Sequence, residues 1–167
     1  LLCLVGNPDD PYSLTGWFGT GIDKRLLGET HMYKGEGIFF DPEGLMSTLP
    51  AIVQVILGYL VGDYIQKKSK LPQSQQFDLE KPAIDASWGL YRMLSGLFVI
   101  GVALLVTGYC WDMAFPINKK IWTSSYTIYT SGLAIMAIGT MIYLIEIKKL
   151  RGGVARFFDV FGKNALF

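Results

Sequence analysis

Charged residues are scarce in this sequence, and that scarcity limits what the protein can be. Asp, Glu, Lys and Arg make up 17% of the 167 residues, whereas soluble chains carry roughly 25%. The formal net charge is only +1, so no surplus of Lys and Arg remains to neutralise phosphates, and we expect no nucleic-acid partner. Hydrophobic residues make up 51% of the chain, which favours a membrane protein over a soluble domain.

Residues that mark metal, redox and hydrolytic sites are also few. The two cysteines, Cys3 and Cys110, sit in apolar surroundings without CxxC spacing, and we interpret both as small buried hydrophobic residues. His31 is the one histidine. No phosphate-binding loop, dinucleotide fingerprint or serine nucleophile elbow occurs. The sequence therefore predicts no metal site, and no motif of this kind marks a catalytic residue.

Long apolar runs are what the sequence does contain. Leu45 to Gly62 and Ile121 to Ile145 have no charged residue, and Gly89 to Cys110 has only Arg92. A helix needs about 17–25 mostly apolar residues to cross a bilayer. Aromatic residues flank the run from 89 to 110 at both ends, as in a membrane–water interface. We therefore predict an all-α fold, part of a polytopic transmembrane helical bundle with a structured extracytoplasmic loop.

The predicted organisation alternates membrane helices with polar links, and we interpret the chain as a piece of a larger membrane protein. Transmembrane helices are expected at 41–65, 89–111 and 121–147. The other segments are the end of a helix plus an extracytoplasmic loop (1–40), a cytoplasmic loop (66–88), an extracytoplasmic turn (112–120), a cytoplasmic link (148–160) and the start of a truncated helix (161–167).

The distribution of Lys and Arg orients these helices. If the spans alternate, ten of the 15 Lys and Arg residues fall on the side that holds 63–92 and 148–163, and the other five fall on the opposite side. Positive charge tends to stay in the cytoplasm. The long loop at 6–40 is therefore expected outside the cytoplasm.

The start of the first predicted helix has a clear local pattern. Asp41 is predicted as the N-cap, Pro42 as the first helical residue and Glu43 as a second acid in the first turn. Further along, Gly58 and Gly62 form a GxxxG pattern that would allow another helix, including one from a second copy, to approach closely.

Polar groups that could bind a substrate gather on the predicted outer side. Two carboxylates and a histidine near the membrane surface could transfer protons. Spacing alone instead favours helix capping by the two acids and packing of the histidine within its loop. The hydroxyls of 124–127 either line a polar cavity or bond to helix carbonyls. The candidate substrate-binding residues are His31, Asp41, Glu43, Asn118, Lys119, Trp122, Ser125 and Tyr126, with Asp23 and Lys120 on the same side.

Three motifs, taken in order, resemble a known family. They are IDKRLLGETHMY at 22–33, FDPEGL at 40–45 and INKKIWTSSY at 117–126. Their order and spacing are similar to those of the heparan-alpha-glucosaminide N-acetyltransferase family and its bacterial relatives, which are often labelled N-acetylglucosamine-related transporters. The resemblance covers most of the chain from Ile22 onward, as a central-to-C-terminal fragment.

The resemblance implies a transmembrane enzyme of the bacterial inner membrane that moves acetyl from cytosolic acetyl-CoA to the amine of a glucosamine-type sugar. Its partners would be membrane lipid, the amino sugar and the rest of its own polypeptide. The family's central histidine belongs to a His-x-x-Trp-x-Gly motif that is absent here, so we expect it upstream and expect this piece alone to be inactive. His31 matches another family position, Gly-x-x-His-x-Tyr. The alternatives are a segment of a sugar transporter without chemistry, or a purely structural segment.

Overall fold

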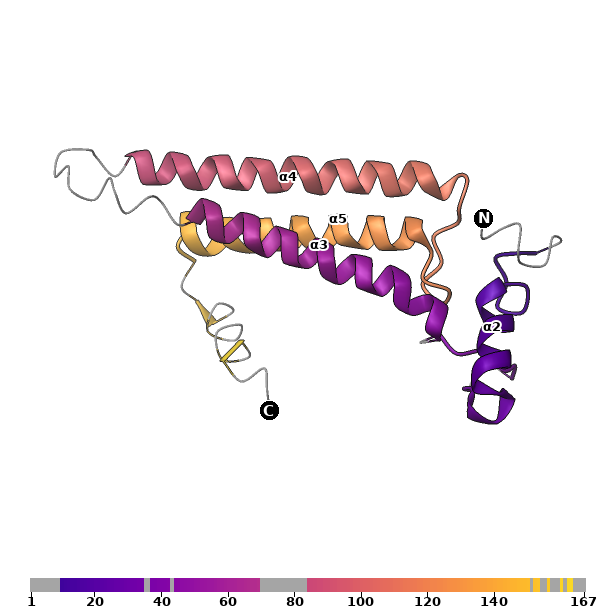
Figure 1. Cartoon of the computed structure of the whole chain (residues 1–167). Coiled ribbons are helices and arrows are strands. Elements are labelled where there is room, and N and C mark those ends of the chain that lie inside the picture. Colours follow the sequence, from indigo (N-terminus) through magenta and orange to yellow (C-terminus); the bar gives the residue numbers. More distant parts are fainter. Residues whose placement is uncertain are drawn as a thin grey trace.

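The computed structural model describes residues 10–34, 37–42, 44–69, 84–150, 152–153, 156, 160 and 162–163. Within them the regular structure is helical (Figure 1). The helices are α2 (Phe18–Leu27), the 3₁₀ turn η1 (Glu29–His31), α3 (Leu45–Ser69), α4 (Ile84–Asp112), α5 (Ser124–Ile142) and its π-helical end η3 (Tyr143–Ile147).

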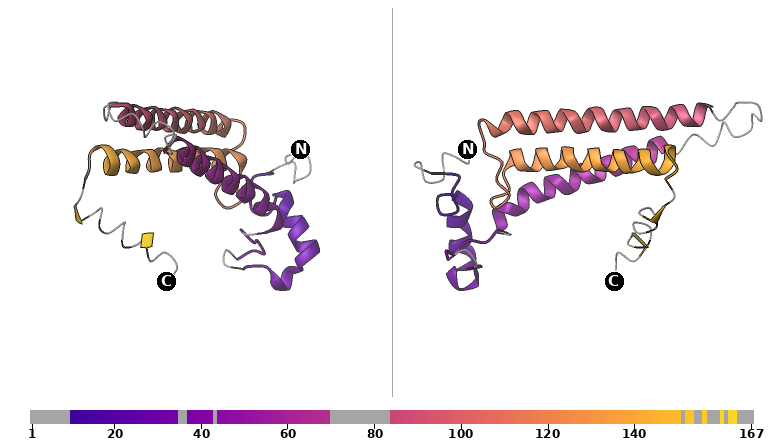
Figure 2. Two further views of the ribbon diagram at one scale, coloured as in Figure 1. Left: turned by 60° about the vertical axis from the view of Figure 1, so that its left-hand side comes forward. Right: turned by 180° about the vertical axis from the view of Figure 1, so that it is seen from behind.

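The three long helices α3, α4 and α5 form a bundle, and α2 lies at one end of it (Figures 1 and 2). At that end α3 begins, α4 ends and α5 begins. All three helices are long and apolar enough to cross a membrane, with mean hydropathies of 1.8, 2.1 and 1.8. They also carry many exposed large apolar side chains, a surface suited to lipid or to other apolar helices. These features indicate an integral membrane protein.

Helix α4 packs closely on α5 because glycines let the two backbones touch. A Cβ atom added to Gly132 of α5 would lie 2.9 Å from the carbonyl oxygen of Gly101 on α4. A Cβ added to Gly108 would lie 2.8 Å from the backbone nitrogen of Tyr129. In contrast, Gly58 and Gly62 have no atom within 4 Å of an added Cβ, so the part of the chain that the structure describes makes no use of the predicted GxxxG contact.

The predicted N-cap of the first long helix is wrong. Helix α3 begins at Leu45, and the Leu45 N–H donates to Oδ1 of Asp23 on α2 at 3.1 Å. The Asp41 carbonyl accepts from the Gly44 N–H at 3.2 Å, in a turn that precedes the helix. The cap thus comes from a residue 22 positions earlier in the chain, and local spacing could not reveal it. Glu43 lies outside the described residues.

Other boundaries and burials also differ from expectation. Helix α3 continues through Pro50 to Ser69 and α4 starts at Ile84, so both enter the predicted loop at 66–88. Helix α5 starts at Ser124 because Thr123 caps it. Cys110 is exposed on α4, which contradicts its predicted burial, and this fits a lipid-facing position near the end of an apolar helix. Cys3 lies outside the described residues, as do 1–9, 70–83 and 164–167.

Candidate functional site

The three motif segments meet at the end of the bundle that carries α2. Trp17, directly before α2, forms a buried apolar cluster with Phe40 and with Ile121. The ring centroids of Trp17 and Phe40 are 6.3 Å apart in an edge-on arrangement. Phe40 precedes α3 and Ile121 precedes α5, so one cluster joins segments that are about a hundred residues apart in sequence.

A second set of contacts ties the first loop to the turn between α4 and α5. The Tyr12 ring packs edge-on against Phe115 at 5.2 Å between centroids, and the Tyr12 hydroxyl donates to the Ala114 carbonyl at 3.3 Å. At the end of α4, Oδ1 of Asp112 accepts from the Ile117 N–H at 2.6 Å. The described part of the long loop is therefore structured, as predicted.

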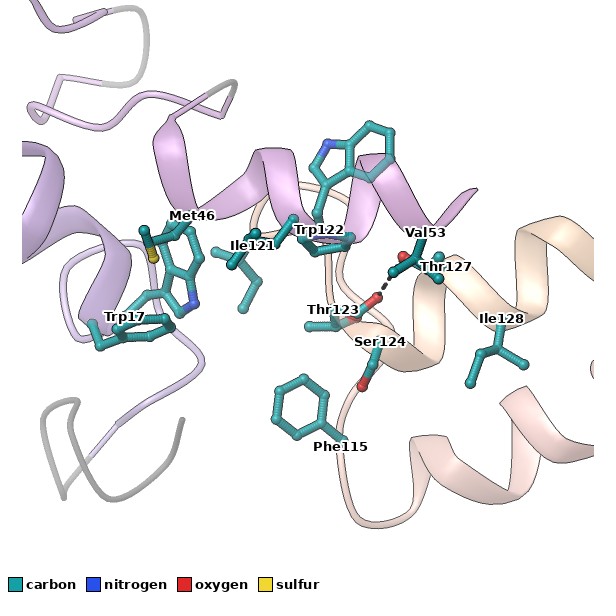
Figure 3. Close-up of a pocket in the computed structure, with 13 residues that line it drawn as sticks. Trp17, Met46, Val53, Phe115, Ile121, Trp122, Thr123, Ser124, Thr127 and Ile128 are labelled. Carbon is teal, nitrogen blue, oxygen red and sulfur yellow. Dashed lines mark hydrogen bonds between the residues drawn. The ribbon is translucent and has the colours of Figure 1, made fainter. Parts of the chain in front are cut away.

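A partly open apolar cavity of about 330 Å³ lies beside these contacts (Figure 3). Its walls come from the start of α2, the first turns of α3, the 115–123 loop and the first turn of α5. The hydroxyls of Thr123, Ser124 and Thr127 lie in its lining, and among the residues that the structure describes no lining residue is acidic, basic or a histidine. The lining residues are Trp17, Phe18, Met46, Leu49, Pro50, Val53, Phe115, Ile121, Trp122, Thr123, Ser124, Thr127 and Ile128.

Thr123 is the centre of the hydrogen-bond network that holds one wall of the cavity. Its Oγ1 accepts from the Asn118 N–H at 3.0 Å, from the Ser125 hydroxyl at 3.1 Å and from the Tyr126 N–H at 3.4 Å. The Asn118 side-chain oxygen accepts from the Lys120 N–H at 2.9 Å. Asn118 and Ser125, which is fully buried, thus shape the loop from behind the cavity rather than lining it.

Trp122 is the predicted site residue that does line the cavity. Its backbone adopts a left-handed conformation with φ of 48°, which is uncommon for a bulky residue. Its ring packs edge-on against the Tyr126 ring, with 5.9 Å between centroids. The structure therefore brings Asn118, Trp122, Ser125 and Tyr126 together around the start of α5.

Of the two interpretations of the 124–127 hydroxyls, bonding to a helix carbonyl is correct for Thr127, whereas the cavity beside them is apolar and not polar. Ser124 and Thr127 line the cavity. At the same time the Thr127 hydroxyl donates to the Thr123 carbonyl at 3.2 Å, a bond to the preceding helical turn. Ser125 bonds to Thr123 and stays out of the lining.

The other predicted site residues that the structure describes lie outside the cavity lining. His31 is exposed, and its Nδ1 lies 3.1 Å from both the Leu27 carbonyl oxygen and the Thr30 hydroxyl. Lys119 is exposed, and Asp41 is partly buried. Among the described residues no three His, Cys, Asp or Glu side chains come together as metal ligands.

Asp23 supports the first turn of α3, beside the cavity. Its position in the sequence did not predict this role. The side chain is 1% exposed, and its Oδ2 has no hydrogen-bond partner among the described residues. Burial raises the pKa of Asp23, the hydrogen bond from the Leu45 N–H opposes that rise, and the nearby charge of Asp41 adds to it. Sequence reasoning also missed Thr123, although a threonine directly before a helical run is a typical N-cap signal.

Comparison with known proteins supports the resemblance drawn from the three motifs. No family model matches the chain. The heparan-alpha-glucosaminide N-acetyltransferase of Mus musculus is 26% identical over 164 residues, and that of Homo sapiens is 25% identical over 165 residues. This chain is distantly similar to a membrane N-acetyltransferase. Each match covers 91% of this chain and 22% of the relative, so the chain spans about a fifth of the length of these curated relatives.

Proposed function

We propose that this chain is a segment of an integral-membrane acyltransferase that acetylates the amine of a glucosamine-type sugar. The observation that carries the proposal is the similarity to an N-acetyltransferase along 91% of the chain. The three motif segments also lie together at one end of the bundle: Asp23 of the first bonds to Leu45 of the second, and Phe40 of the second packs with Ile121 of the third, which lines the cavity. The acetyl donor in this proposal is acetyl-CoA, acting as a second substrate.

The reaction places definite demands on the site. The amine nitrogen attacks the thioester carbonyl carbon, the new C–N bond forms, the amine proton passes to a base and the thiolate leaves. A base and donors to the developing oxyanion are required. The described residues of the lining supply hydroxyls but no carboxylate or imidazole, so the proposal assigns the base to another part of the protein, consistent with a family histidine upstream.

The cavity would then contribute to acceptor binding rather than to proton transfer. The indole and phenyl rings of Trp17, Phe115 and Trp122 provide aromatic surfaces, and such faces attract ammonium groups. In the proposed orientation this end faces outside the cytoplasm, because ten of the 15 Lys and Arg residues belong to the opposite side.

The test is a transfer assay on membrane vesicles that contain the full-length protein. Acetyl-CoA with a labelled acetyl group and free glucosamine are supplied on opposite sides, and labelled N-acetylglucosamine is measured against vesicles without the protein. Protein-dependent product is the expected result. Uptake of labelled sugar without any acetyl transfer would overturn the proposal in favour of a transporter.

A further inference from the structure

The Asp23 carboxyl connects two helices that are otherwise separate elements. The first N–H groups of a helix have no partner within the helix, and a side chain close by in sequence usually caps them. In α3 the Leu45 N–H instead bonds to Asp23, which lies in the middle of α2. This hydrogen bond fixes the position of α2 relative to the first turn of α3.

Gly44 shows how tightly this carboxyl is packed. A Cβ atom at Gly44 would collide with Oδ2 of Asp23 and would lie 2.8 Å from its Cγ. Only a glycine therefore leaves room for the carboxyl against the backbone at this point. Since Oδ2 is buried and has no donor within reach among the described residues, the carboxyl has been inserted at an energetic cost.

The same helix supplies one wall of the cavity. Trp17 and Phe18 at the start of α2 line the cavity together with Met46 and Leu49 of α3, and both Phe18 and Met46 pack against the Trp17 cluster. Asp23 lies one to two turns further along α2. The bond between Asp23 and Leu45, together with the packing of Phe18 and Met46 against the Trp17 cluster, thus sets where the aromatic wall stands relative to α3.

We propose that Asp23 is a positioning residue for the cavity: its carboxyl locks α2 to the first turn of α3 and so holds Trp17 and Phe18 in place. The proposal goes beyond the acyltransferase assignment, because the lock is defined by α2 and α3 alone and would operate for any ligand of the cavity.

The docking of α2 on α3 through Asp23 depends on pH, and the groups around the carboxyl determine the direction of that dependence. Burial lifts the pKa of Asp23 above its ordinary value of 3.8, with the Leu45 N–H opposing and Asp41 adding to the rise. Lys24 on the same helix pairs with Glu29 at 3.3 Å, and α3 has no charged residue before Asp63. A raised pKa means that docking is strongest below the ordinary value and weakens as the pH rises through the raised one.

Fluorine NMR of the full-length protein in detergent or nanodiscs tests the lock. A trifluoromethyl-phenylalanine in place of Phe18 gives one reporter at the cavity wall. The wild type is expected to show a docked signal at acid pH. A second signal is expected from the undocked state, in which the Asp23–Leu45 bond is broken. Between the ordinary and the raised pKa of Asp23, the ratio of undocked to docked signal should increase by up to about tenfold per pH unit.

Four variants separate the lock from a general role in folding. Asp23→Asn keeps the acceptor oxygen and is expected to stay docked with no pH dependence, whereas Asp23→Ala should be undocked throughout. Asp41→Asn should move the transition to lower pH. Glu29→Gln removes an exposed acid of the η1 turn, close to Asp23 in sequence, and should keep the pH dependence of the wild type.

Two results would overturn the proposal: a docked, wild-type signal in Asp23→Ala, or a pH transition that persists in Asp23→Asn. If Asp23→Ala does not accumulate, the comparison of wild type with Asp23→Asn decides alone. Because the readout is a chemical shift, its outcome does not depend on whether the protein transfers acetyl groups.

Discussion

Trp122 combines a strained backbone with a side chain at the cavity. Its φ of 48° places it in the left-handed region, where a bulky residue costs of order 1–3 kcal/mol. The surrounding Asn118–Thr123 hydrogen bonds hold the loop in this shape. Strain that the surroundings maintain is common at binding sites, so Trp122 is the residue in the lining at which substitution should affect function most.

We predict that Trp122→Ala lowers acetyl transfer by the full-length protein at least tenfold while changing its stability little. Loss of the indole removes a cavity wall, whereas the Asn118–Thr123 hydrogen bonds that hold the loop do not involve the Trp122 side chain. Transfer rates and thermal midpoints in detergent measure the two effects. Trp111→Ala is the matched control, since Trp111 is exposed on α4 and outside the lining. Equal loss of activity in both variants would contradict a specific role for Trp122.

At the scale of helices, the bundle divides into a tight pair and a loosely attached third member. Helices α4 and α5 touch through the backbones at Gly101, Gly108 and Gly132. Only 6% of the apolar window of α3 is buried, compared with 28% for α4. The α4–α5 pair therefore forms the rigid framework on which the 113–123 loop is built.

This difference predicts opposite effects for two glycine substitutions. Gly132→Ala places a methyl group 2.9 Å from backbone atoms of α4, and overpacking of this kind costs about 1–3 kcal/mol. Gly62→Ala meets no atom within 4 Å and should be neutral or stabilising. Thermal midpoints of the full-length protein measure both. A larger loss for Gly62→Ala would mean that the GxxxG face packs against a segment or partner beyond the described residues.

The sequence predicted the long helices well and their ends less well, for a physical reason. Charged side chains are costly inside a bilayer, so a long run without charge marks a membrane helix. The runs 45–62, 89–110 and 121–145 each fall largely within a helix that could span a membrane. Helix starts depend on which group caps them. Thr123 is local and could have been identified, whereas Asp23 reaches Leu45 only after the chain has folded.

At the scale of the whole molecule, part of the candidate site was predictable. Charge bias and motif order predicted the three motif segments on one side, and the structure joins the first to the second through Asp23 and Leu45 and the second to the third through Phe40 and Ile121. Of the described residues chosen for their chemistry, Trp122 is the one that lines the cavity. Polar character was a poor guide because most of the lining is apolar, and apolar side chains in a membrane protein do not distinguish a cavity from a lipid contact.

The orientation of the molecule is testable by labelling. In a variant without native cysteines, we expect Thr30→Cys, in the η1 turn of the first loop, to react with a membrane-impermeant maleimide added outside intact cells. Lys68→Cys, at the far end of α3, should react only after the membrane is opened. Both positions are exposed on the protein, so access depends on the side of the membrane. The reverse pattern would invert the proposed topology.

The anchoring of α3 at one end has a consequence for events across the membrane. Its 25 residues span about 37 Å, and Val53 of the cavity lies about 12 Å from the fixed start. If α3 moves as a rigid rod about the Asp23–Leu45 bond, a ligand that displaces Val53 by about 1 Å moves Ser69 by about 3 Å. A ligand in the cavity would then shift the far end of α3, at the opposite face of the bilayer, about three times as far as it shifts Val53.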